Sequence, residues 1–318
     1  MTSSEIIAIT VCTRHRPVML AKCLRSIARE IAQHQTADFL VVVENDEIEQ
    51  SRHVIDDIRH EHPSLKILYQ LEETPGIPFA RNTAVKSALE NGADWIAFID
   101  DDETCEPGWL AAMRRGIDEF QSAVLTGPVR STMPEDAPDW FQKPKFKNFE
   151  RGRRLRTAAT NNTLLSASWL VQNMTPPYFD LAMQFTGGSD TDFFYRLSDK
   201  GGTITWLDDA VVAEEIPASR LTARWQIQRN FRVAANAFKV NQKRNGLVWA
   251  LFRGLPKMIG RLLAGIGLLL LAVLAGVVSL RKGKWLMLQS ISALASAAGT
   301  FTSIFGFLPT PYKKIQGG

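Results

Sequence analysis

The sequence predicts an α/β fold built on a mostly parallel sheet, followed by a basic and hydrophobic helical region. Over the first 100 residues, apolar segments of strand length alternate with segments of helical periodicity, which is typical of a doubly wound parallel sheet. After residue 215 the chain has no acidic residue and contains two long uncharged segments. We therefore expect an α/β domain over residues 1–240 and membrane-associating helices over residues 241–318.

Each element of the first 100 residues follows from its local pattern. Strands are expected where apolar residues run without interruption, over 6–12, 39–43, 65–71 and 95–99. Helices are expected between them, over 18–32, 54–60 and 80–90, and the last of these meets the stop signal Asn91-Gly92. A short strand is expected over 123–125, and the α/β pattern of the first 100 residues resumes over 175–206. A basic amphipathic helix is expected over 219–240.

The charge distribution divides the chain into two parts. The net charge of +4 combines 37 Lys and Arg with 33 Asp and Glu. All 33 acidic residues lie at or before Glu215, together with 22 basic ones, so this part carries a formal charge of −11; the remainder carries +15. A basic and apolar tail without acids suits an anionic membrane surface. Nucleic acid is the alternative partner for such charge, and the apolar segments argue against it.

The tail contains one segment of membrane-spanning length. Residues 262–280 are uncharged, and nineteen helical residues extend roughly 28 Å, about the hydrocarbon thickness of a bilayer. The second segment, 286–307, is more polar, and we expect it to span the membrane, re-enter it or lie at its interface. Buried core helices are the alternative for both. Three basic residues between the segments, Arg281, Lys282 and Lys284, fit poorly with a loop on the far side.

The N-terminus and the cysteines indicate the compartment. Residues 1–16 have no basic segment before their short apolar run, so they read as a first strand and not as a signal peptide. Cys12, Cys23 and Cys105 are odd in number and lack metal-type spacing, which is typical of free thiols in a reducing compartment. We expect the protein at the inner (cytoplasmic) membrane, with the α/β domain facing the cytoplasm.

A cluster of carboxylates follows the fourth predicted strand. Asp100, Asp101, Asp102 and Glu103 come directly after five apolar residues. Buried carboxylates are costly without a cation nearby, and crevices beyond strand ends are where open α/β sheets bind ligands. Oxygen ligands favour Mn²⁺ or Mg²⁺, and Mg²⁺ usually bridges to substrate phosphates. The alternative reading is a solvated acidic turn.

Further motifs accompany the acidic cluster in a fixed order. They are Cys12-Thr13-Arg14 and Glu44-Asn45-Asp46 at strand ends, Gly76–Asn82 before the acidic strand, and Gly187–Asp192 at the start of a later helix. Together they resemble the family 2 glycosyltransferases with the GT-A fold, over roughly residues 5–240. Shared strings such as Ala80-Arg81-Asn82 and Gly127–Arg130 resemble bacterial exopolysaccharide glucosyltransferases of the succinoglycan type.

The resemblance implies a reaction. It implies an inverting glycosyltransferase that moves a hexose, glucose first, from a UDP-sugar donor with the help of Mn²⁺ or Mg²⁺. An acceptor hydroxyl then needs a single carboxylate as general base, since one-step displacement uses no enzyme nucleophile. From the membrane location we expect a lipid-linked saccharide acceptor, in exopolysaccharide or other cell-surface polysaccharide biosynthesis. No nucleic acid partner is expected.

The resemblance also implies roles for donor-site residues. Thr13 and Glu44 match the positions that contact uracil and ribose, and Arg14 is grouped with them. Arg81 lies in the segment near the uracil or diphosphate. Glu44 replaces the more usual Asp and is one carbon longer, which puts the detailed contact in doubt.

The acidic residues carry the remaining roles. Asp100 and Asp102 match the outer positions of the family's D-x-D motif, with Asp102 as the direct metal ligand, Asp100 nearer the ribose, and Asp101 counted with the donor site. Asp190 matches the general base, although Ser189 replaces the usual preceding Glu.

Three residues are candidates for acceptor or diphosphate contacts. They are Asp192, Arg224 and Trp225. Arg224-Trp225 resembles the Arg-Trp of the processive Q-x-x-R-W motif, but Leu221 stands at the Gln position, so we read the enzyme as non-processive.

Three alternatives remain open. A lipopolysaccharide core or O-antigen glycosyltransferase would share the same motifs. A nucleotidyltransferase would share the sheet and the metal site, but it normally has a Gly-rich triphosphate loop, and residues 12–17 contain no glycine. A non-enzymatic membrane scaffold would not need the acidic cluster.

Overall fold

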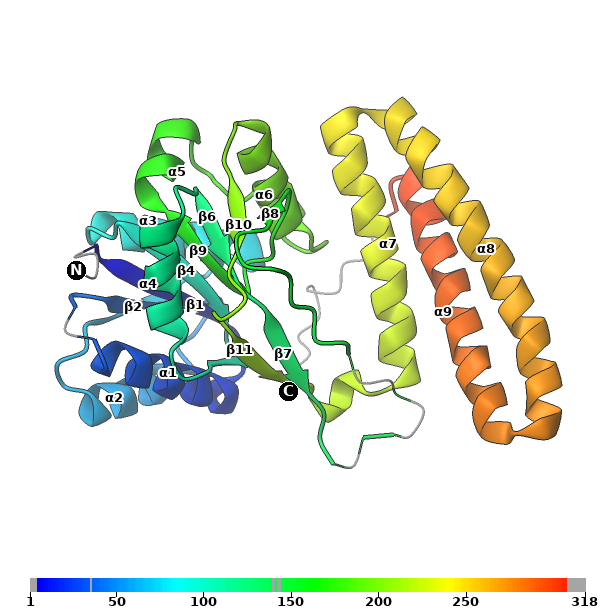
Figure 1. The fold of residues 1–318 in the computed structure, drawn as a ribbon, viewed down its shortest axis with the longest axis horizontal. Coiled ribbons are helices and arrows are strands. Elements are labelled where there is room, and N and C mark those ends of the chain that lie inside the picture. The colour runs from blue at the N-terminus through cyan, green and yellow to red at the C-terminus, as the bar shows by residue number, and fades with distance from the viewer. Residues whose placement is uncertain (1–4, 35, 136, 139–140, 142–143, 308–318) are drawn as a thin grey trace.

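An α/β domain and a unit of three long helices make up the molecule (Figure 1). The computed structural model describes residues 5–34, 36–135, 137–138, 141 and 144–307. Residues 308–318 of the expected C-terminal region therefore lie outside the described residues.

The predicted sheet is confirmed and is mostly parallel. Its eight strands are arranged in the order β3-β2-β1-β4-β9-β6-β10-β8. Their bounds are β1 (Ile7–Thr13), β2 (Phe39–Glu44), β3 (Ile67–Leu71), β4 (Trp95–Asp100), β6 (Val124–Thr126), β8 (Arg154–Leu155), β9 (Asn162–Ser166) and β10 (Ile204–Trp206). Strand β9 runs antiparallel to β4 and β6, and β8 runs antiparallel to β10.

Helices cover both faces of this sheet, which is why its central strands are apolar on both sides. One face packs against α1 (Pro17–Ala32), α2 (Arg52–Glu61) and α4 (Trp109–Glu119). The other packs against α3 (Ile77–Glu90), α5 (Ala167–Asn173) and α6 (Ser189–Asp199). Side chains alternate between the two faces along β1. Ile7, Ile9 and Val11 therefore pack in the apolar core on the first face, and Ala8 packs in the core on the second.

A small second sheet lies at the edge of the domain. It contains β5 (Glu103–Cys105), β11 (Val212–Glu215) and β7 (Val129–Thr132) in that order. Because β5 begins three residues after β4 ends, this sheet fixes the end of the acidic cluster against a distant part of the chain.

A buried ion pair braces the domain away from the strand ends. Nη2 of Arg114, on α4, lies 2.6 and 2.5 Å from the two carboxylate oxygens of Asp38, and both side chains are almost fully buried. The same Asp38 carboxylate accepts a hydrogen bond from the backbone of Ile7, at 2.8 Å. The pair therefore connects α4 to the first strand and to the segment before β2.

The C-terminal unit consists of α7 (Ala223–Asn245), α8 (Leu247–Val278) and α9 (Leu280–Ile304). Helix α9 packs between α7 and α8, and only Ser279 separates α8 from α9 (Figure 1). The basic residues 281, 282 and 284 therefore lie in the first turns of α9 and not in a loop. Helix α7 continues across residue 240 without a break.

Small residues let α9 approach α7 closely. A Cβ atom on Gly299 would lie 2.1 Å from the carbonyl oxygen of Phe231, so only glycine fits there. Two α9 hydroxyls donate to α7 carbonyls, Ser296 to Asn230 at 3.4 Å and Ser303 to Ala235 at 3.1 Å. These two serines, which help to make the second apolar segment polar, are therefore interhelical contacts.

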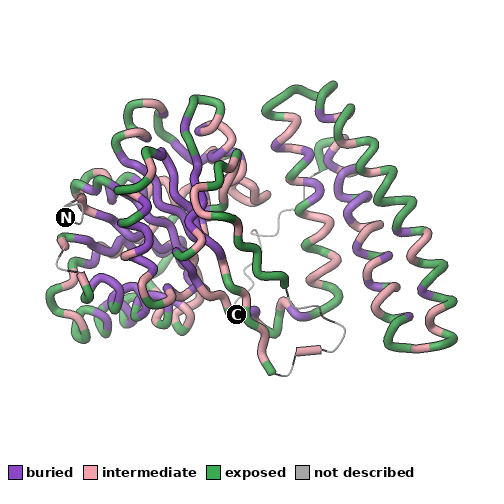
Figure 2. The backbone as a smooth tube through the Cα atoms, viewed as in Figure 1, coloured by how far each residue is buried: buried purple, intermediate pink, exposed green. Residues whose placement is uncertain are grey.

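Helix α8 exposes much of its apolar surface (Figure 2). Among the described residues it is the one helix long and apolar enough to cross a membrane, with a mean hydropathy of 2.4 over its most apolar window and 11% of that window buried. Leu270, Val273 and Val277 are 64%, 61% and 86% exposed. So large an exposed apolar surface is typical of a membrane or protein contact.

Candidate active site

The candidate site lies where β1, β2 and β4 end. These strands pair in register, with Thr13 opposite Glu44 and Cys12 opposite Asp100. Their carboxyl ends therefore meet at one edge of the sheet, where the chain turns away on either side of β1. This is the position at which open α/β sheets bind ligands in a crevice. The motifs that follow these strands in the sequence converge at this edge.

Asp101 and Asp102 both face arginines. The Asp101 carboxylate accepts hydrogen bonds from the Thr13 hydroxyl at 2.8 Å and from Nη1 of Arg16 at 3.0 Å. Oδ2 of Asp102 lies 3.4 Å from the same Arg16 nitrogen and 2.7 Å from Nη2 of Arg220. Burial raises the pKa of Asp101, although Arg16 opposes this. Both carboxylates are oriented by cations, which lowers the cost of gathering them here.

Asp100 has a strongly perturbed acidity. Partial burial at the end of β4 raises its pKa to about 7, Arg81 opposes this rise, and repulsion from Asp102, Asp101 and Asp190 adds to it. Nη2 of Arg81 lies 3.9 Å from Oδ1 of Asp100, and the Asp100 side chain is still 48% exposed. Asp100 is thus accessible to a ligand and electrostatically coupled to Asp190, which comes from a different element.

Arg220 is a site residue that sequence reasoning missed. It ends a 3-10 turn, η2 (Ala218–Arg220), and its Nη1 lies 2.5 Å from Oε1 of Glu214 on β11. Burial raises the pKa of Glu214, whereas Arg220 lowers it. Arg220 therefore joins the small sheet to the acidic cluster. Nothing in its local sequence indicates this, since Asp102 is 118 residues away.

Asp190 lies at the N-terminus of α6. Gly187 and Gly188 precede it with φ of 81° and 85°, a backbone region in which glycine is strongly favoured. One Asp190 oxygen accepts a hydrogen bond from the backbone of Thr191, at 2.7 Å. The hydroxyl of Ser189 lies 3.5 Å from Nη1 of Arg81, so α6 is held beside the residue that faces Asp100. Asp190 is half-buried, and it lies close enough to Asp100 to raise the pKa of that carboxyl.

The three candidate acceptor contacts are not gathered at one point. The Asp192 carboxylate is buried between Arg196 and Lys243, each at 2.8 Å, and it ties α6 to α7. Arg224 is exposed and Trp225 half-buried at the start of α7. Arg220 lies over the Trp225 ring at 6.0 Å, which places Trp225 near the acidic cluster.

Glu44 is placed inside the domain. It is fully buried, and its carboxylate accepts hydrogen bonds from the backbones of Gln50 and Ser51, both at 3.0 Å, and from the hydroxyls of Ser51 and Tyr69. Its carboxylate is therefore bound to the loop after β2 and to Tyr69 of β3. Arg14 is half-buried, and its Nε is buried with no hydrogen-bond partner among the described residues.

Asparagines hold the loops around the site. Asn82 donates to the Phe179 carbonyl at 2.8 Å and accepts from its amide at 3.0 Å, which fixes the segment before α6. Asn45 does the same for the loop before α3, accepting from Gly76 at 2.7 Å. The asparagine next to Arg81 in the sequence is therefore structural, and it positions the arginine.

The site fits a divalent cation shared with a phosphate ligand. In the part of the chain that the structure describes, no three carboxylate, imidazole or thiolate groups converge to enclose a metal ion. Asp100 and Asp102 provide two carboxylates, and Mg²⁺ is usually held by one or two carboxylates together with substrate phosphates. Three arginines, Arg16, Arg81 and Arg220, surround these carboxylates and suit an anionic ligand.

Comparison with known proteins also indicates that the ligand is a sugar donor, because the matches are to glycosyltransferases and to a polysaccharide biosynthesis protein. Residues 8–169 match the model of the family described as Glycosyl transferase family 2. The succinoglycan biosynthesis protein ExoM of Rhizobium meliloti (strain 1021) is 33% identical over 230 residues, which cover 71% of this chain and 72% of that protein.

Solved structures share the fold. The mannosyltransferase PcManGT of Pyrobaculum calidifontis, in complex with GDP-Man and Mn²⁺, matches with a TM-score of 0.58 at 15% identity, over 93% of this chain and 86% of that one. S. aureus TarS 1-349, in complex with UDP-GlcNAc, matches with a TM-score of 0.53 at 16% identity, over 93% and 91%. The chain spans 43% of the longer S. aureus TarS chain.

The family match covers half of the chain and includes β1, β2, β4 and the acidic cluster. The similarity to ExoM extends over a longer part, and the solved glycosyltransferases share the arrangement of sheet and helices. This chain is therefore a glycosyltransferase with a GT-A-like fold, and it belongs to glycosyl transferase family 2.

Proposed function

We propose that this glycosyltransferase moves a hexose from a UDP-sugar to a lipid-linked saccharide, with inversion at the anomeric carbon. Glucose is the first choice of sugar and galactose the second. The observation that carries the proposal is that Asp100 and Asp102, at and just after the end of β4, lie near Asp190 of α6, whose charge raises the pKa of Asp100. The first two suit a metal-bound diphosphate, and the third suits proton removal from an attacking hydroxyl.

The donor half of the proposal rests on charge. The leaving group is a nucleoside diphosphate, whose developing negative charge needs cations. Arg16, Arg81 and Arg220 are within reach of the carboxylates that would hold Mn²⁺ or Mg²⁺. When bound, the metal neutralises charge on the departing diphosphate. PcManGT is described with Mn²⁺ and TarS with UDP-GlcNAc, which supports a nucleotide-sugar donor and a divalent metal here.

The acceptor half of the proposal rests on Asp190. Its second carboxylate oxygen has no hydrogen-bond donor among the described residues, since Thr191 donates to Oδ1 from both its backbone and its hydroxyl. A free carboxylate oxygen facing a donor sugar can accept the acceptor's proton as the new bond forms. A single displacement of this kind converts an α-linked UDP-sugar into a β-linked product.

The membrane location in the proposal rests on α8. Residues 1–240 would carry the chemistry, and residues 241–318 would hold it at the cytoplasmic face of the inner membrane. Exposed leucines and valines along α8 favour contact with lipid. A lipid-linked saccharide would be presented to the crevice from that surface. ExoM is a succinoglycan biosynthesis protein, which supports a role in exopolysaccharide biosynthesis.

A donor and acceptor panel tests this function. Full-length protein in detergent is incubated with Mn²⁺, each of several UDP-sugars and extracted lipid-linked saccharides, and products are read by mass spectrometry and NMR. We expect UDP release and a product with the large anomeric proton coupling of a β-linkage. An α-linked product, or transfer only to soluble acceptors, contradicts the proposal.

Three outcomes separate the alternatives. Release of pyrophosphate in place of UDP would identify a nucleotidyltransferase. Transfer only to lipid A-linked core saccharide or to O-antigen intermediates would place the enzyme in lipopolysaccharide biosynthesis. A protein that binds no UDP in the presence of Mn²⁺ would be a scaffold and not an enzyme.

A further inference from the structure

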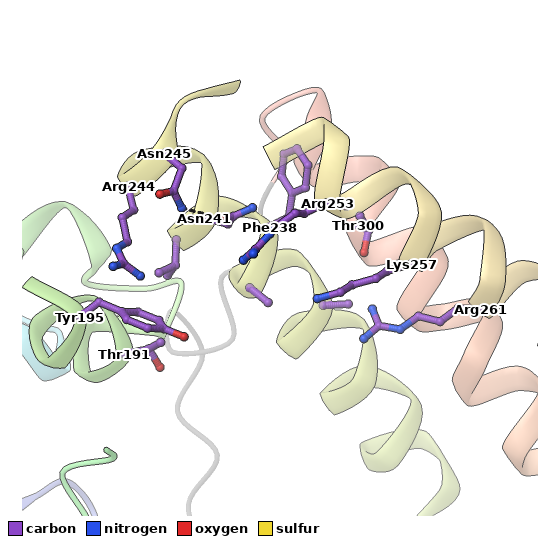
Figure 3. Close-up of a pocket in the computed structure, with 14 residues that line it drawn as sticks. Thr191, Tyr195, Phe238, Asn241, Arg244, Asn245, Arg253, Lys257, Arg261 and Thr300 are labelled. Atoms are coloured by element: carbon purple, nitrogen blue, oxygen red, sulfur yellow. Dashed lines mark hydrogen bonds between the residues drawn. The ribbon is translucent and has the colours of Figure 1, made fainter. Parts of the chain in front are cut away.

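A basic cavity lies between the α/β domain and the three C-terminal helices. Its volume is about 290 Å³, and its lining comes from α6, α7, α8 and α9 (Figure 3). The lining includes four cationic side chains, Arg244, Arg253, Lys257 and Arg261, and no carboxylate. The cavity is separate from the crevice at the strand ends.

Three of these cations form a row on α8. Arg253, Lys257 and Arg261 follow one another at intervals of four residues, so they lie on one side of the helix over roughly 12 Å. Figure 3 shows Lys257 and Arg261 extending from α8 toward the side where Thr191 and Tyr195 of α6 lie. Like charges at this spacing repel one another, so the row destabilises the helix unless an anion binds it.

The row has no acidic partner in the described chain. Arg253 lies over the ring of Trp249, and no ion pair joins Arg253, Lys257 or Arg261 to a carboxylate among the described residues. No acidic residue follows Glu215 in the sequence, so the helical unit cannot supply one. In contrast, Arg244 is paired with Asp199. Three uncompensated cations at one cavity indicate a ligand with more than one negative charge.

The cavity is next to the proposed general base. Thr191, which lines it, directly follows Asp190 at the start of α6. Gly254 on α8 lies close to Phe238 of α7, where a Cβ atom would be 2.8 Å from the ring, so the cavity wall is closely packed. A ligand group held here would place what is attached to it near the crevice.

The part of α8 that follows the row is apolar. Leu271 and Val278 lie on the same side of the helix as the row and are 53% and 88% exposed. An anionic group in the cavity could therefore carry a hydrocarbon chain that leaves along α8. A multiply charged head with a lipid tail and a saccharide near Asp190 describes an acceptor joined to its lipid through a diphosphate.

We propose that Arg253, Lys257 and Arg261 bind the diphosphate that joins the acceptor saccharide to its lipid. This inference rests on the proposed function, because it names the chemical class of its acceptor. A diphosphate that links a saccharide to a lipid carries one negative charge on each of its phosphates, whereas a phosphatidylglycerol headgroup carries a single one. Three adjacent cations therefore favour the acceptor over bulk anionic lipid.

Binding without turnover tests the cavity directly. The probe is a short prenyl diphosphate, titrated into full-length protein in detergent with EDTA and without UDP-sugar, so that no metal bound at Asp102 can hold it. We expect K257Q/R261Q to weaken binding by about tenfold for each cation removed. The charge-matched control is K282Q/K284Q, which removes two exposed cations from the first turns of α9, and it should bind like the wild type. Equal weakening in both variants, or in neither, overturns the proposal.

Kinetics separate this inference from the proposed function. The same saccharide is offered with a diphosphate linkage and as an alkyl glycoside, and we expect K257Q/R261Q to raise KM only for the first, with the KM for UDP-sugar unchanged. Equal effects on both acceptors overturn the diphosphate assignment while the enzyme remains a glycosyltransferase. A defect seen only in micelles containing phosphatidylglycerol would assign the cavity to a phospholipid headgroup and would also overturn it. If the wild type glycosylates neither acceptor, the proposed function fails, and the EDTA titration still decides whether the cavity binds a lipid diphosphate.

Discussion

Nη2 of Arg220 lies 2.7 Å from Oδ2 of Asp102, so a cation of the protein itself stands beside the expected metal ligand. The same guanidinium contacts Glu214 and holds the small sheet to the cluster. A metal ion that binds Asp102 has to compete with this guanidinium or displace it. Arg220 therefore sets part of the affinity of the site for a divalent cation.

Replacing Arg220 with Gln should tighten Mn²⁺ binding in the absence of UDP. Loss of the competing charge should lower the Kd by about tenfold, which corresponds to ~1.4 kcal/mol. Calorimetry with Mn²⁺ measures this, with Asp102→Ala as the variant that loses binding. Arg229→Gln removes a nearby cation of α7 and serves as the control. An unchanged Kd in Arg220→Gln would show that Arg220 does not compete for Asp102.

Asp190→Asn should abolish turnover while donor binding persists. The amide keeps the shape of the side chain but cannot accept the acceptor's proton, and loss of a general base commonly costs about 10²–10⁴-fold in rate. Initial rates of UDP release and the Kd for UDP with Mn²⁺ are the two measurements. Asp118→Asn, on the exposed side of α4, is the matched control. A variant that turns over at the wild-type rate removes Asp190 from the mechanism.

Asp100 should make the metal-free protein less stable at alkaline pH. Its pKa is about 7 in the folded protein and near 3.8 in the unfolded chain, so the folded state binds more protons between these values. Stability therefore falls as pH rises from about 4 to about 7. Asp100→Asn should melt higher than the wild type at pH 8, and the gap should shrink steadily as the pH falls toward the unfolded pKa. Thermal melts in EDTA across this range measure it, and a constant gap at all pH values would contradict the raised pKa.

Much of this site could be predicted from the sequence, because its parts follow buried strands. The apolar runs of β1, β2 and β4 lead directly into Thr13, Glu44 and Asp100, so their meeting at one edge follows from parallel pairing. The rest depends on contacts that spacing does not reveal. Glu44 is occupied by Ser51 and Tyr69, which come from the next two elements.

The elements that the sequence did not predict are held by polar side chains. Strand β9 begins with Asn162, which is buried because it accepts from the Trp109 ring nitrogen and donates to the carbonyls of Pro128 and Ala210. Because Asn162 and Thr163 are polar, this segment lacks the apolar pattern that predicts a central strand. Strand β5 was not predicted because Glu103 was counted with the acidic cluster. In the structure its carboxylate accepts hydrogen bonds from the Asn161 side chain and from the Asp100 backbone.

Asp38→Ala should destabilise the α/β domain strongly. It would leave the almost fully buried Arg114 guanidinium without its carboxylate, and breaking a buried pair in this way typically costs about 3–5 kcal/mol. Chemical denaturation of the detergent-solubilised protein measures the change. Asp56→Ala breaks the exposed pair with Arg59 and should cost at most about 1 kcal/mol. Similar losses for the two variants would mean that the buried pair contributes no more than a surface one.

Charges on the exposed side of α8 should release the protein from membranes. Leu270→Asp combined with Val273→Asp adds two carboxylates, each costing about 2.5–3.5 kcal/mol in a bilayer. Flotation of vesicle-bound protein measures the change. Val18→Asp combined with Val171→Asp, on exposed positions of the α/β domain, should leave flotation unchanged. A wild-type protein that stays in solution without detergent would mean that α8 contacts protein and not lipid.

The close contact between Gly299 and the Phe231 carbonyl fixes where α9 docks along α7. With α8 and α9 in the bilayer, the height of the crevice above the lipid surface is set by how far along α7 the hairpin is docked. A slip by one helical turn would move the crevice by about 5.4 Å, more than the length of a single side-chain contact. The glycine favours one docking position, so in the proposed membrane location it would also fix the height of the crevice above the lipid.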